Sequence, residues 1–188
     1  RLFLALMALD VLDTTLGERR SLLLYDTPHN FMRVDKNLPL IHRKGACPAR
    51  NFGIVGPGSD HFNTALGEPV LVPGSMGSSS YILVGLGNPE ALWSASHGAG
   101  RCLSRGEALK GNNAEFEEFM RRFRVVTPVD FNRQDIRQRR DIVVKKMDEI
   151  KAEAPYAYKG IEAVVDTLGQ AGIAKPVAEL KPIMTIKG

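Results

Sequence analysis

The sequence has few cysteines and no long hydrophobic run. Its two cysteines, Cys47 and Cys102, are too few for a disulfide framework and do not form a Cys-x-x-Cys pair. We therefore expect a reduced, intracellular protein with a cytoplasmic location. The longest apolar run, residues 2–9, ends at Asp10, well short of the roughly 20 residues that a membrane span needs. The sequence thus predicts no transmembrane helix.

The composition is that of an ordinary globular domain. The chain has 188 residues, of which 44% are hydrophobic and 24% are charged, which excludes a disordered or collagen-like protein. Its formal net charge of +4 favours a polyanionic partner such as RNA, DNA or a nucleotide, although the excess is small. The chain starts with Arg1 instead of Met, so we expect the C-terminal part of a longer protein.

The first half of the chain is expected to alternate short strands with polar loops. A helix is predicted over residues 2–16, closed by Gly17. A turn-forming cluster at 26–30 places His29 and Asn30 on a loop, and residues 47–69 are predicted to form one long loop. The predicted strands cover residues 21–25, 38–42, 69–73 and 81–84.

The second half is expected to be mainly helical. Phe116, Phe119, Met120 and Phe123 share one helical face, behind a capping box of Asn112 and Glu115. The later segments are a second apolar stripe over 136–154 that Pro155 stops, a helix over 161–171 that closes at Gly172, and a strand or extended chain over 177–186. We predict one α+β domain over residues 1–188, with a mixed sheet and flanking helices.

The segment Ser96-His97-Gly98-Ala99-Gly100-Arg101 is the first candidate for chemistry. Small residues let a phosphate approach the backbone amides, Arg101 adds positive charge, and His97 would face the phosphorus atom. A neutral imidazole is a competent nucleophile, and a phosphoramidate can pass its nucleotidyl group onward. A glycine-rich turn with a helix-capping histidine explains the same residues equally well.

The second candidate is the turn Pro73-Gly74-Ser75-Met76-Gly77 between two predicted strands, whose amides and hydroxyls could line a nucleotide. It lacks the Lys-Ser/Thr pair of a Walker loop, and a plain hairpin connection is the commoner explanation. The basic setting of Lys44 would depress the thiol pKa of Cys47, but a structural cysteine is the favoured interpretation.

Two further groups of side chains are given their simpler explanation. His42 and His61 are interpreted as solvated loop residues, because neither has a metal-binding spacing. Basic residues cluster over 121–124 and 133–146 among acidic ones, and a solvated helix face is favoured over RNA binding there.

Taken together, these motifs resemble the C-terminal half of the RtcB-type RNA ligase family. Their number and their family order argue against coincidence. The matching segments are Tyr25-Asp-Thr-Pro-His29-Asn30, His42-Arg-Lys-Gly-Ala46, Pro73-Gly-Ser-Met-Gly77 with Ser80-Tyr81, Gly85-Leu-Gly-Asn-Pro-Glu90, Ser96-His-Gly-Ala-Gly-Arg101, Ser104-Arg105, Glu153-Ala-Pro155, Ala157-Tyr158-Lys159 and Lys187-Gly188. The resemblance is weakest over 47–64 and 106–150.

The resemblance implies an RNA ligase that uses GTP and Mn²⁺. Such ligases join an RNA 3′-phosphate or 2′,3′-cyclic phosphate to a 5′-hydroxyl, as in tRNA splicing and RNA repair. His97 would be guanylylated by GTP, and the GMP would then pass to the RNA 3′-phosphate. An archease-type activator is a further partner that the resemblance suggests.

The resemblance also implies binding residues. His29 corresponds to a manganese ligand, and Asn30 to a guanylate contact. The remaining guanylate contacts would come from Pro73, Gly74, Ser75, Met76, Ser80, His97, Gly98, Ala99, Gly100 and Lys187. On its own, Lys187 would be interpreted as a frayed terminal lysine.

Some family features do not occur in these residues. The Asp-x-x-Cys metal motif, a Gly-Asn-His-Phe segment and a further metal histidine belong upstream, and Cys47-Pro48 stands where the family continues Thr-Arg. The alternative hypothesis is therefore a non-catalytic guanine-nucleotide- or RNA-binding module that lacks the full metal centre.

Overall fold

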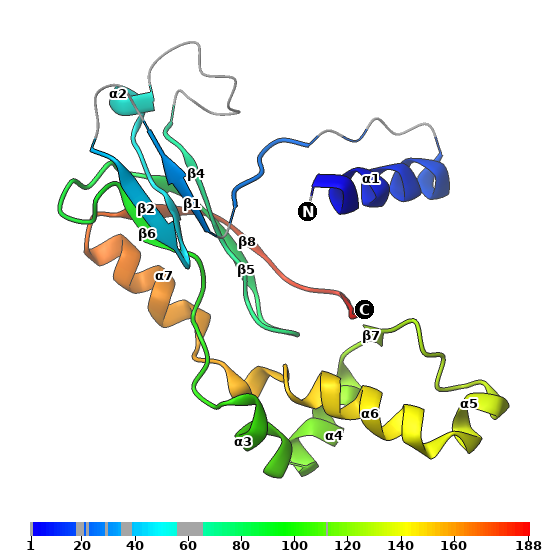
Figure 1. Ribbon diagram of the computed structural model, residues 1–188. Coiled ribbons are helices and arrows are strands. Elements are labelled where there is room, and N and C mark those ends of the chain that lie inside the picture. Colours follow the sequence, from blue (N-terminus) through cyan, green and yellow to red (C-terminus); the bar gives the residue numbers. More distant parts are fainter. Residues whose placement is uncertain are drawn as a thin grey trace.

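The computed structural model describes residues 2–17, 21, 23–28, 30–34, 39–55, 66–111 and 113–188 (Figure 1). The helices are α1 (Leu2–Leu16), α2 (Phe52–Val55), α3 (Arg105–Lys110), α4 (Asn113–Arg122), α5 (Gln134–Gln138), α6 (Arg140–Lys151), the 3₁₀ turn η1 (Pro155–Ala157) and α7 (Ile161–Gln170). The strands are β1 (Asn30–Arg33), β2 (Ile41–Lys44), β3 (Ala46–Pro48), β4 (Pro69–Val72), β5 (Ser80–Gly85), β6 (Ser94–Ser96), β7 (Val125–Val126), β8 (Ala174–Leu180) and β9 (Thr185–Ile186). None of the helices among these residues has the length and apolarity to cross a membrane.

The strands form several small sheets. An antiparallel sheet has the order β4-β5-β8, two antiparallel pairs are β1-β2 and β3-β6, and β7 pairs with β9 in parallel. The α+β prediction is confirmed, but the single mixed sheet is wrong. Strands of two to seven residues, separated by loops rich in Gly and Pro, are too short and too dispersed to join one ladder.

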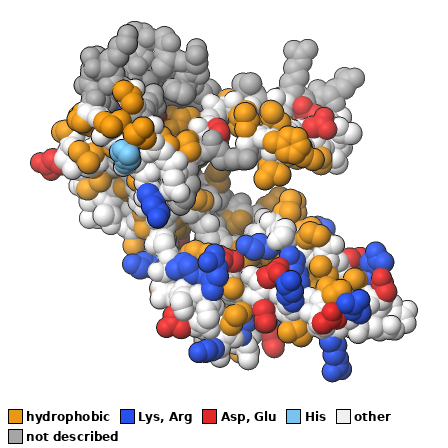
Figure 2. Space-filling model, in the orientation of Figure 1, with side chains coloured by type: hydrophobic (Ala, Val, Ile, Leu, Met, Phe, Trp, Pro, Cys, Tyr) orange, Lys and Arg blue, Asp and Glu red, His pale blue; other side chains and the backbone are white. Residues whose placement is uncertain are grey.

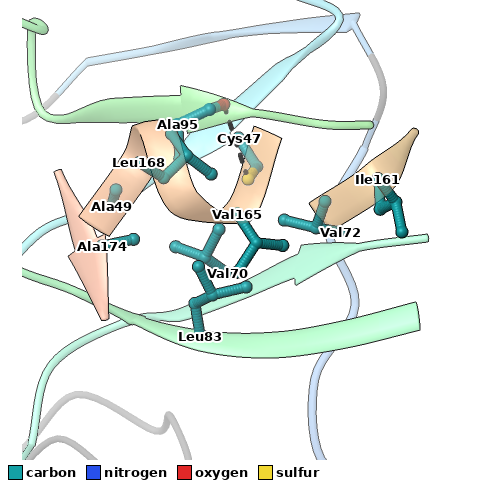
Figure 3. Packing of buried hydrophobic residues seen from close by; sticks show 10 residues of the cluster. All are labelled: Cys47, Ala49, Val70, Val72, Leu83, Ala95, Ile161, Val165, Leu168 and Ala174. Carbon is teal, nitrogen blue, oxygen red and sulfur yellow. Dashed lines mark hydrogen bonds between the residues drawn. The ribbon is translucent and has the colours of Figure 1, made fainter. Parts of the chain in front are cut away.

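One hydrophobic core lies between the sheets and α7, and we call β3 to β6, β8 and α7 the sheet region. Alternation along β4 buries Val70 and Val72, and the i, i+4, i+7 positions of α7 bury Ile161, Val165 and Leu168. Figure 3 shows these side chains pointing toward one another, with Leu83 beneath them. The alternating side chains of the strand and the apolar stripe of the helix are thus buried in the same core.

A second core lies among α3, α4, α6 and η1, which we call the helical region. Phe116, Ile150 and Ala154 are buried there, and Phe119, Met147 and Tyr156 pack against them. Met76 joins this core although it belongs to the turn between β4 and β5. The β4–β5 turn therefore links the two cores. The prediction of one domain over residues 1–188 stays a prediction.

Several predicted elements are confirmed. The helix over 2–16 is α1, and Gly17 ends it with a φ of 69°. The predicted strands at 69–73 and 81–84 are β4 and β5, the aromatic stripe lies on α4, and the helix over 161–171 is α7. The extended C-terminal segment contains β8 and β9, with β8 starting at Ala174.

Other elements differ from the predictions. The buried strand over 21–25 is wrong among the described residues, because Leu23 and Leu24 are exposed and pair with no strand. The strand predicted over 38–42 is instead β2, which runs on to Lys44, and Asn30 begins β1 instead of lying on a loop. The long loop over 47–69 is interrupted by β3 and α2.

The stripe over 136–154 is two helices, α5 and α6, which are interrupted at Arg139. Arg139 has φ −90° and ψ 75°, outside the helical range. The capping box predicted for Asn112 lies outside the described residues, and the structure has one at Ser104 and Glu107, at the start of α3.

Candidate functional site

A cavity of about 330 Å³ lies where the sheet region meets the helical region. Its wall comes from three stretches of chain that are far apart in sequence, together with the C-terminal lysine. The lining residues are Pro73, Gly74, Ser75, Met76, Ser78, His97, Gly98, Ala99, Gly100, Glu153, Tyr158, Lys159, Ile161 and Lys187. Both predicted loops, 73–76 and 97–100, thus line one cavity.

His97 directly follows β6. The pairing of β6 with β3 fixes the position of the backbone at His97. Ser96 is opposite Ala46, and the His97 amide donates to the Gly45 carbonyl at 3.1 Å. The imidazole is half-buried, and its Nδ1 atom is shielded from solvent. The side chain can therefore present Nε2 to the cavity.

The loop after His97 requires glycine. Gly98 has a φ of 152° and Gly100 a φ of 69°, values that favour glycine. Ser96 Oγ donates to the Gly98 carbonyl at 2.8 Å. A Cβ on Gly98 would lie 3.6 Å from the Pro73 carbonyl oxygen, so the two loops lie next to each other. Small residues here leave room for a phosphate group beside the backbone.

The turn after β4 is held by its own serines. Ser80 Oγ accepts from the Gly74 amide at 3.1 Å, and the hydroxyls of Ser75 and Ser78 are 2.8 Å apart. A Cβ on Gly74 would lie 2.1 Å from the Ser79 carbonyl oxygen, so this position accepts only glycine. Ser80 does not line the cavity. Its contact with the site is the hydrogen bond that holds Gly74.

Two lysines bring positive charge to the cavity. The Lys187 amide donates to the Val126 carbonyl at 2.7 Å, next to the β7–β9 pair, so this part of the chain is anchored. Lys159 is held through its amide, which donates to the Gly100 carbonyl at 3.1 Å. Two ammonium groups at a cavity with a small-residue loop suit an anionic ligand.

Five lining residues were not among the predicted site residues: Ser78, Glu153, Tyr158, Lys159 and Ile161. Of these, Glu153, Tyr158 and Lys159 belong to the motif Glu153-Ala-Pro155 with Ala157-Tyr158-Lys159, which the sequence connects with the site only through the family resemblance. No local spacing brings them to His97. The pairing of residue 101 with residue 158, across more than fifty residues, does so.

Arg101 is directed differently from the prediction. It does not line the cavity, and its guanidinium donates to the carbonyls of Leu103 (2.9 Å) and Ala152 (2.6 Å). It also donates to Glu153 Oε2 at 3.2 Å and to the Tyr158 hydroxyl at 3.0 Å. The guanidinium is thus engaged by protein groups instead of facing a phosphate.

The described residues do not make a manganese centre. His29, the predicted ligand, lies outside them, and nowhere within them do three or more His, Cys, Asp or Glu side chains gather as a metal site would need. Asn30, the predicted guanylate contact, is opposite Lys44 in β1–β2 and does not line the cavity.

The remaining candidate residues that the structure describes do not line the cavity. Cys47 is fully buried, and burial raises the pKa of its thiol to about 11, so it is a structural cysteine. His42 is exposed as expected, but it lies on β2 instead of on a loop, and His61 lies outside the described residues. Exposed ion pairs occupy several arginines of the helices: Arg121 and Arg122 with Glu118, Arg133 with Asp135, and Arg139 with Asp141.

Comparison with known proteins agrees with the motifs. A family model described as "tRNA-splicing ligase RtcB" matches residues 1–188. The tRNA-splicing ligase RtcB of Archaeoglobus fulgidus is 39% identical over 180 residues, covering 88% of this chain and 33% of the relative. That of Methanococcus maripaludis is 34% identical over 180 residues, with the same coverage. The RNA-splicing ligase RtcB of Mycobacterium bovis is 34% identical over 183 residues, covering 88% of this chain and 36% of the relative.

The chain spans about a third of the length of these curated relatives. The family model, in contrast, matches every residue of the chain. The residues that line the cavity include the segments on which the resemblance rests, among them 73–76, 97–100 and Lys187. On the strength of that match, the chain belongs to the RtcB family.

Proposed function

We propose that the protein acts in RNA ligation, with the fold of its family and with His97 as the nucleophile that receives GMP from GTP. The substrates would be an RNA with a 3′-phosphate or 2′,3′-cyclic phosphate and an RNA with a 5′-hydroxyl, as in tRNA splicing or RNA repair. The relatives are named as tRNA-splicing and RNA-splicing ligases, which supports RNA as the substrate class.

The observation that carries the proposal is the meeting of His97, the 73–76 turn and Lys187 in one cavity. A nucleotide ligand needs room for its base and ribose, and small-residue backbone and cationic groups for its phosphates. The cavity offers both, with Gly98 to Gly100 beside the histidine and with Lys159 and Lys187 on the wall.

The proposed first step is transfer of a nucleotidyl group to the imidazole. Since Nδ1 is shielded, Nε2 of neutral His97 attacks the α-phosphorus of GTP. The Nε2–P bond forms, the bond from phosphorus to the bridging oxygen breaks, and pyrophosphate leaves. The imidazole ring carries a positive charge after this step, and it becomes neutral again when the Nε2–P bond is broken in the next step.

In that step an oxygen of the RNA 3′-phosphate attacks the same phosphorus, and His97 leaves as neutral imidazole. The RNA end then carries GMP in a phosphoanhydride. The 5′-hydroxyl of the second RNA attacks the 3′-phosphorus, loses its proton and releases GMP, which leaves a phosphodiester. The residues of the cavity serve to position the reacting groups and to balance phosphate charge.

Manganese and an archease-type activator stay predictions from the resemblance. No step above is assigned to the metal, because the described residues do not gather a metal site. A cytoplasmic location likewise stays a prediction.

The decisive experiment tests for the covalent intermediate. The protein, as expressed from its gene, is incubated with GTP labelled at the α-phosphate and Mn²⁺ and is then denatured. We expect label that survives denaturation, is lost in acid and persists in base, as a histidine phosphoramidate does. A seryl ester would resist acid, so the test separates His97 from its neighbour Ser96.

His97→Ala should abolish the label but leave measurable GTP binding, because the 73–76 turn and the two lysines remain. His42→Ala is the matched control, since His42 is an exposed histidine on β2 away from the lining residues. Label in His97→Ala, or acid-stable label, would refute the nucleophile. Binding of GTP without any label in the unaltered protein would support the non-catalytic binding module instead.

A further inference from the structure

Glu153 joins the loop of His97 to the helical region. Its Oε2 accepts from Arg101 Nη1 at 3.2 Å and from the Tyr158 hydroxyl, while its Oε1 accepts from Arg105 Nε at 3.0 Å. Arg101 lies four residues after His97, and its guanidinium also covers the Tyr158 ring at 4.9 Å. The carboxylate therefore connects the end of the 97–101 segment to the chain beyond α6.

The backbone reinforces the same connection. The Lys159 amide donates to the Gly100 carbonyl at 3.1 Å, and the Cys102 amide donates to the Ala157 carbonyl at 2.9 Å. Arg101 and Tyr158 form an antiparallel bridge between them. In Figure 1 the chain that descends from β6 to α3 passes the chain that leads from α6 to α7 at this place. The bridge thus fixes one wall of the cavity.

The charges favour an ionised Glu153. Burial raises the pKa of its carboxyl, but hydrogen bonds from Tyr158 and Arg105 and the positive charges of Arg101 and Lys187 outweigh it, so the pKa lies below its ordinary value. Burial, together with the hydrogen bond to Glu153, raises the pKa of Tyr158. At neutral pH the group is therefore a carboxylate, two arginines and a neutral phenol.

We propose that Glu153 is a positioning residue for the reaction at His97: through Arg101 and Tyr158 it holds the 97–100 loop against the cavity and sets the rate of nucleotidyl transfer. This inference rests on the proposed function. It assigns Arg101 to the support of the loop, which accounts for a cation that follows the glycine loop but does not line the cavity.

The effect should fall on the rate more than on GTP affinity. Affinity is spread over the 73–76 turn, the glycine loop, Lys159 and Lys187, of which only part depends on the bridge. In-line attack, in contrast, needs the imidazole nitrogen close to the phosphorus and aligned with the leaving oxygen. A misplacement of about 1 Å can cost on the order of 100-fold in rate.

The test compares two carboxylates that are each paired with two arginines. Glu153→Gln keeps the shape of the side chain but removes its charge. Glu118→Gln does the same on α4, where Glu118 pairs with Arg121 and Arg122 but does not line the cavity. Single-turnover transfer of label from GTP is measured over a range of GTP concentrations, and GTP binding is measured separately at equilibrium.

For Glu153→Gln we expect the maximal transfer rate to fall about 10- to 100-fold, and the Kd for GTP to change by less than about threefold. For Glu118→Gln we expect both to stay near those of the unaltered protein. Hydrogen exchange gives a readout that needs no activity: the amides of Cys102 and Lys159 should exchange faster in Glu153→Gln and at the unaltered rate in Glu118→Gln.

Different results separate this inference from the function it rests on. If the unaltered protein takes no label, the proposed function fails. Faster exchange at Cys102 and Lys159 in Glu153→Gln would still indicate that Glu153 holds the 97–100 loop. If the unaltered protein is labelled and Glu153→Gln transfers at the same rate, the positioning role is overturned. Equal losses of rate and of GTP affinity would also overturn it, because they indicate general damage to the cavity.

A variant that keeps the charge guards against loss of folding. Glu153→Asp retains the carboxylate, and Tyr158→Phe removes only the hydroxyl that donates to it. Should Glu153→Gln fail to fold, each of these two is expected to slow transfer less than tenfold with little change in the Kd for GTP. Transfer at the unaltered rate in both would count against the proposal.

Discussion

The buried core of the sheet region is almost entirely aliphatic, whereas the core of the helical region combines aliphatic side chains with aromatic ones and methionines. Val70, Val72 and Leu83 typify the first core, and Phe116 and Met76 typify the second. Branched and small side chains fill the narrow space between sheet and helix, and longer ones fill the irregular space between short helices. The two parts of the chain therefore reach a packed interior with different residue types.

The two regions also place their charges differently. In the sheet region, Arg50 and Glu68 form a bidentate ion pair whose side chains are 5% and 1% exposed. The named pairs on α4 and α5 to α6 are exposed, and Figure 2 shows Lys, Arg, Asp and Glu intermingled over the helices. Apolar side chains are more prominent on the upper part of that face. Charge is thus structural inside the sheet region and mainly solvated on the helices.

The cavity lies where these two kinds of packing meet. The sheet region supplies His97 and the 73–76 turn from strands with fixed register, and the helical region supplies Glu153 and Tyr158. Met76 lines the cavity and is buried in the helical core. The site therefore depends on both cores, and each core supports a different wall.

The largest effect should follow from breaking the buried ion pair. Glu68→Ala leaves Arg50 charged in a nearly closed environment, so we expect a loss of about 3–5 kcal/mol in the free energy of unfolding. Urea unfolding of the expressed protein measures it. The double variant Arg50→Ala with Glu68→Ala should lose less than the sum of the two single losses. A strictly additive result would mean that the pair does not act as a unit.

The next effect separates the two cores. Ile150→Ala removes a fully buried side chain of α6, and we expect a loss of about 2–5 kcal/mol. Hydrogen exchange should speed up at amides of α4 and α6 while amides of β4 and β5 remain protected. Equal acceleration in both regions would show that the cores unfold together and do not differ in local stability.

The elements that could be predicted from the sequence are those with a complete repeat of burial. The apolar stripes of α4 and α7 and the alternation in β4 each indicate which face of the element is buried and how long the element is. β3 is only three residues long and ends in Pro48, so it has no period to recognise. The interruption at Arg139 could not be predicted either, because the apolar spacing continues across it.

The candidate site divides in the same way. His97 and the 73–76 turn stand in short motifs whose residue types already indicate phosphate chemistry, and the structure brings them together. The role of Glu153 could not be predicted, because its partners Arg101 and Arg105 are about fifty residues away in the sequence. Lys187 could be predicted only from the family resemblance, and β9 is what anchors it next to the cavity.

A smaller effect is expected when the pH is lowered. The pKa of Glu153 is lower folded than unfolded, so its contribution to stability is present above the ordinary glutamate value and is lost as pH falls through the folded one. We expect the protection of the Cys102 and Lys159 amides, measured against their intrinsic exchange rates at each pH, to fall only below about pH 4.3, the ordinary glutamate range. Glu153→Gln should show little loss of protection over that window. An equal acid response in both proteins would assign it to other carboxylates.

The smallest effect is expected at the exposed pairs of the helical region. Glu118 contacts two arginines, as Glu153 does, but the arginine side chains are 74% and 81% exposed, so water and salt screen the charges. We therefore expect Glu118→Ala to change the free energy of unfolding by about 0–1 kcal/mol, and the difference to shrink further in 1 M NaCl. The pair of Arg50 and Glu68 should keep most of its effect at that salt concentration, because it is closed to solvent. If Glu118→Ala cost as much as Glu68→Ala, burial would not be what distinguishes the charges of the two regions, and the contrast drawn between them would have to rest on packing alone.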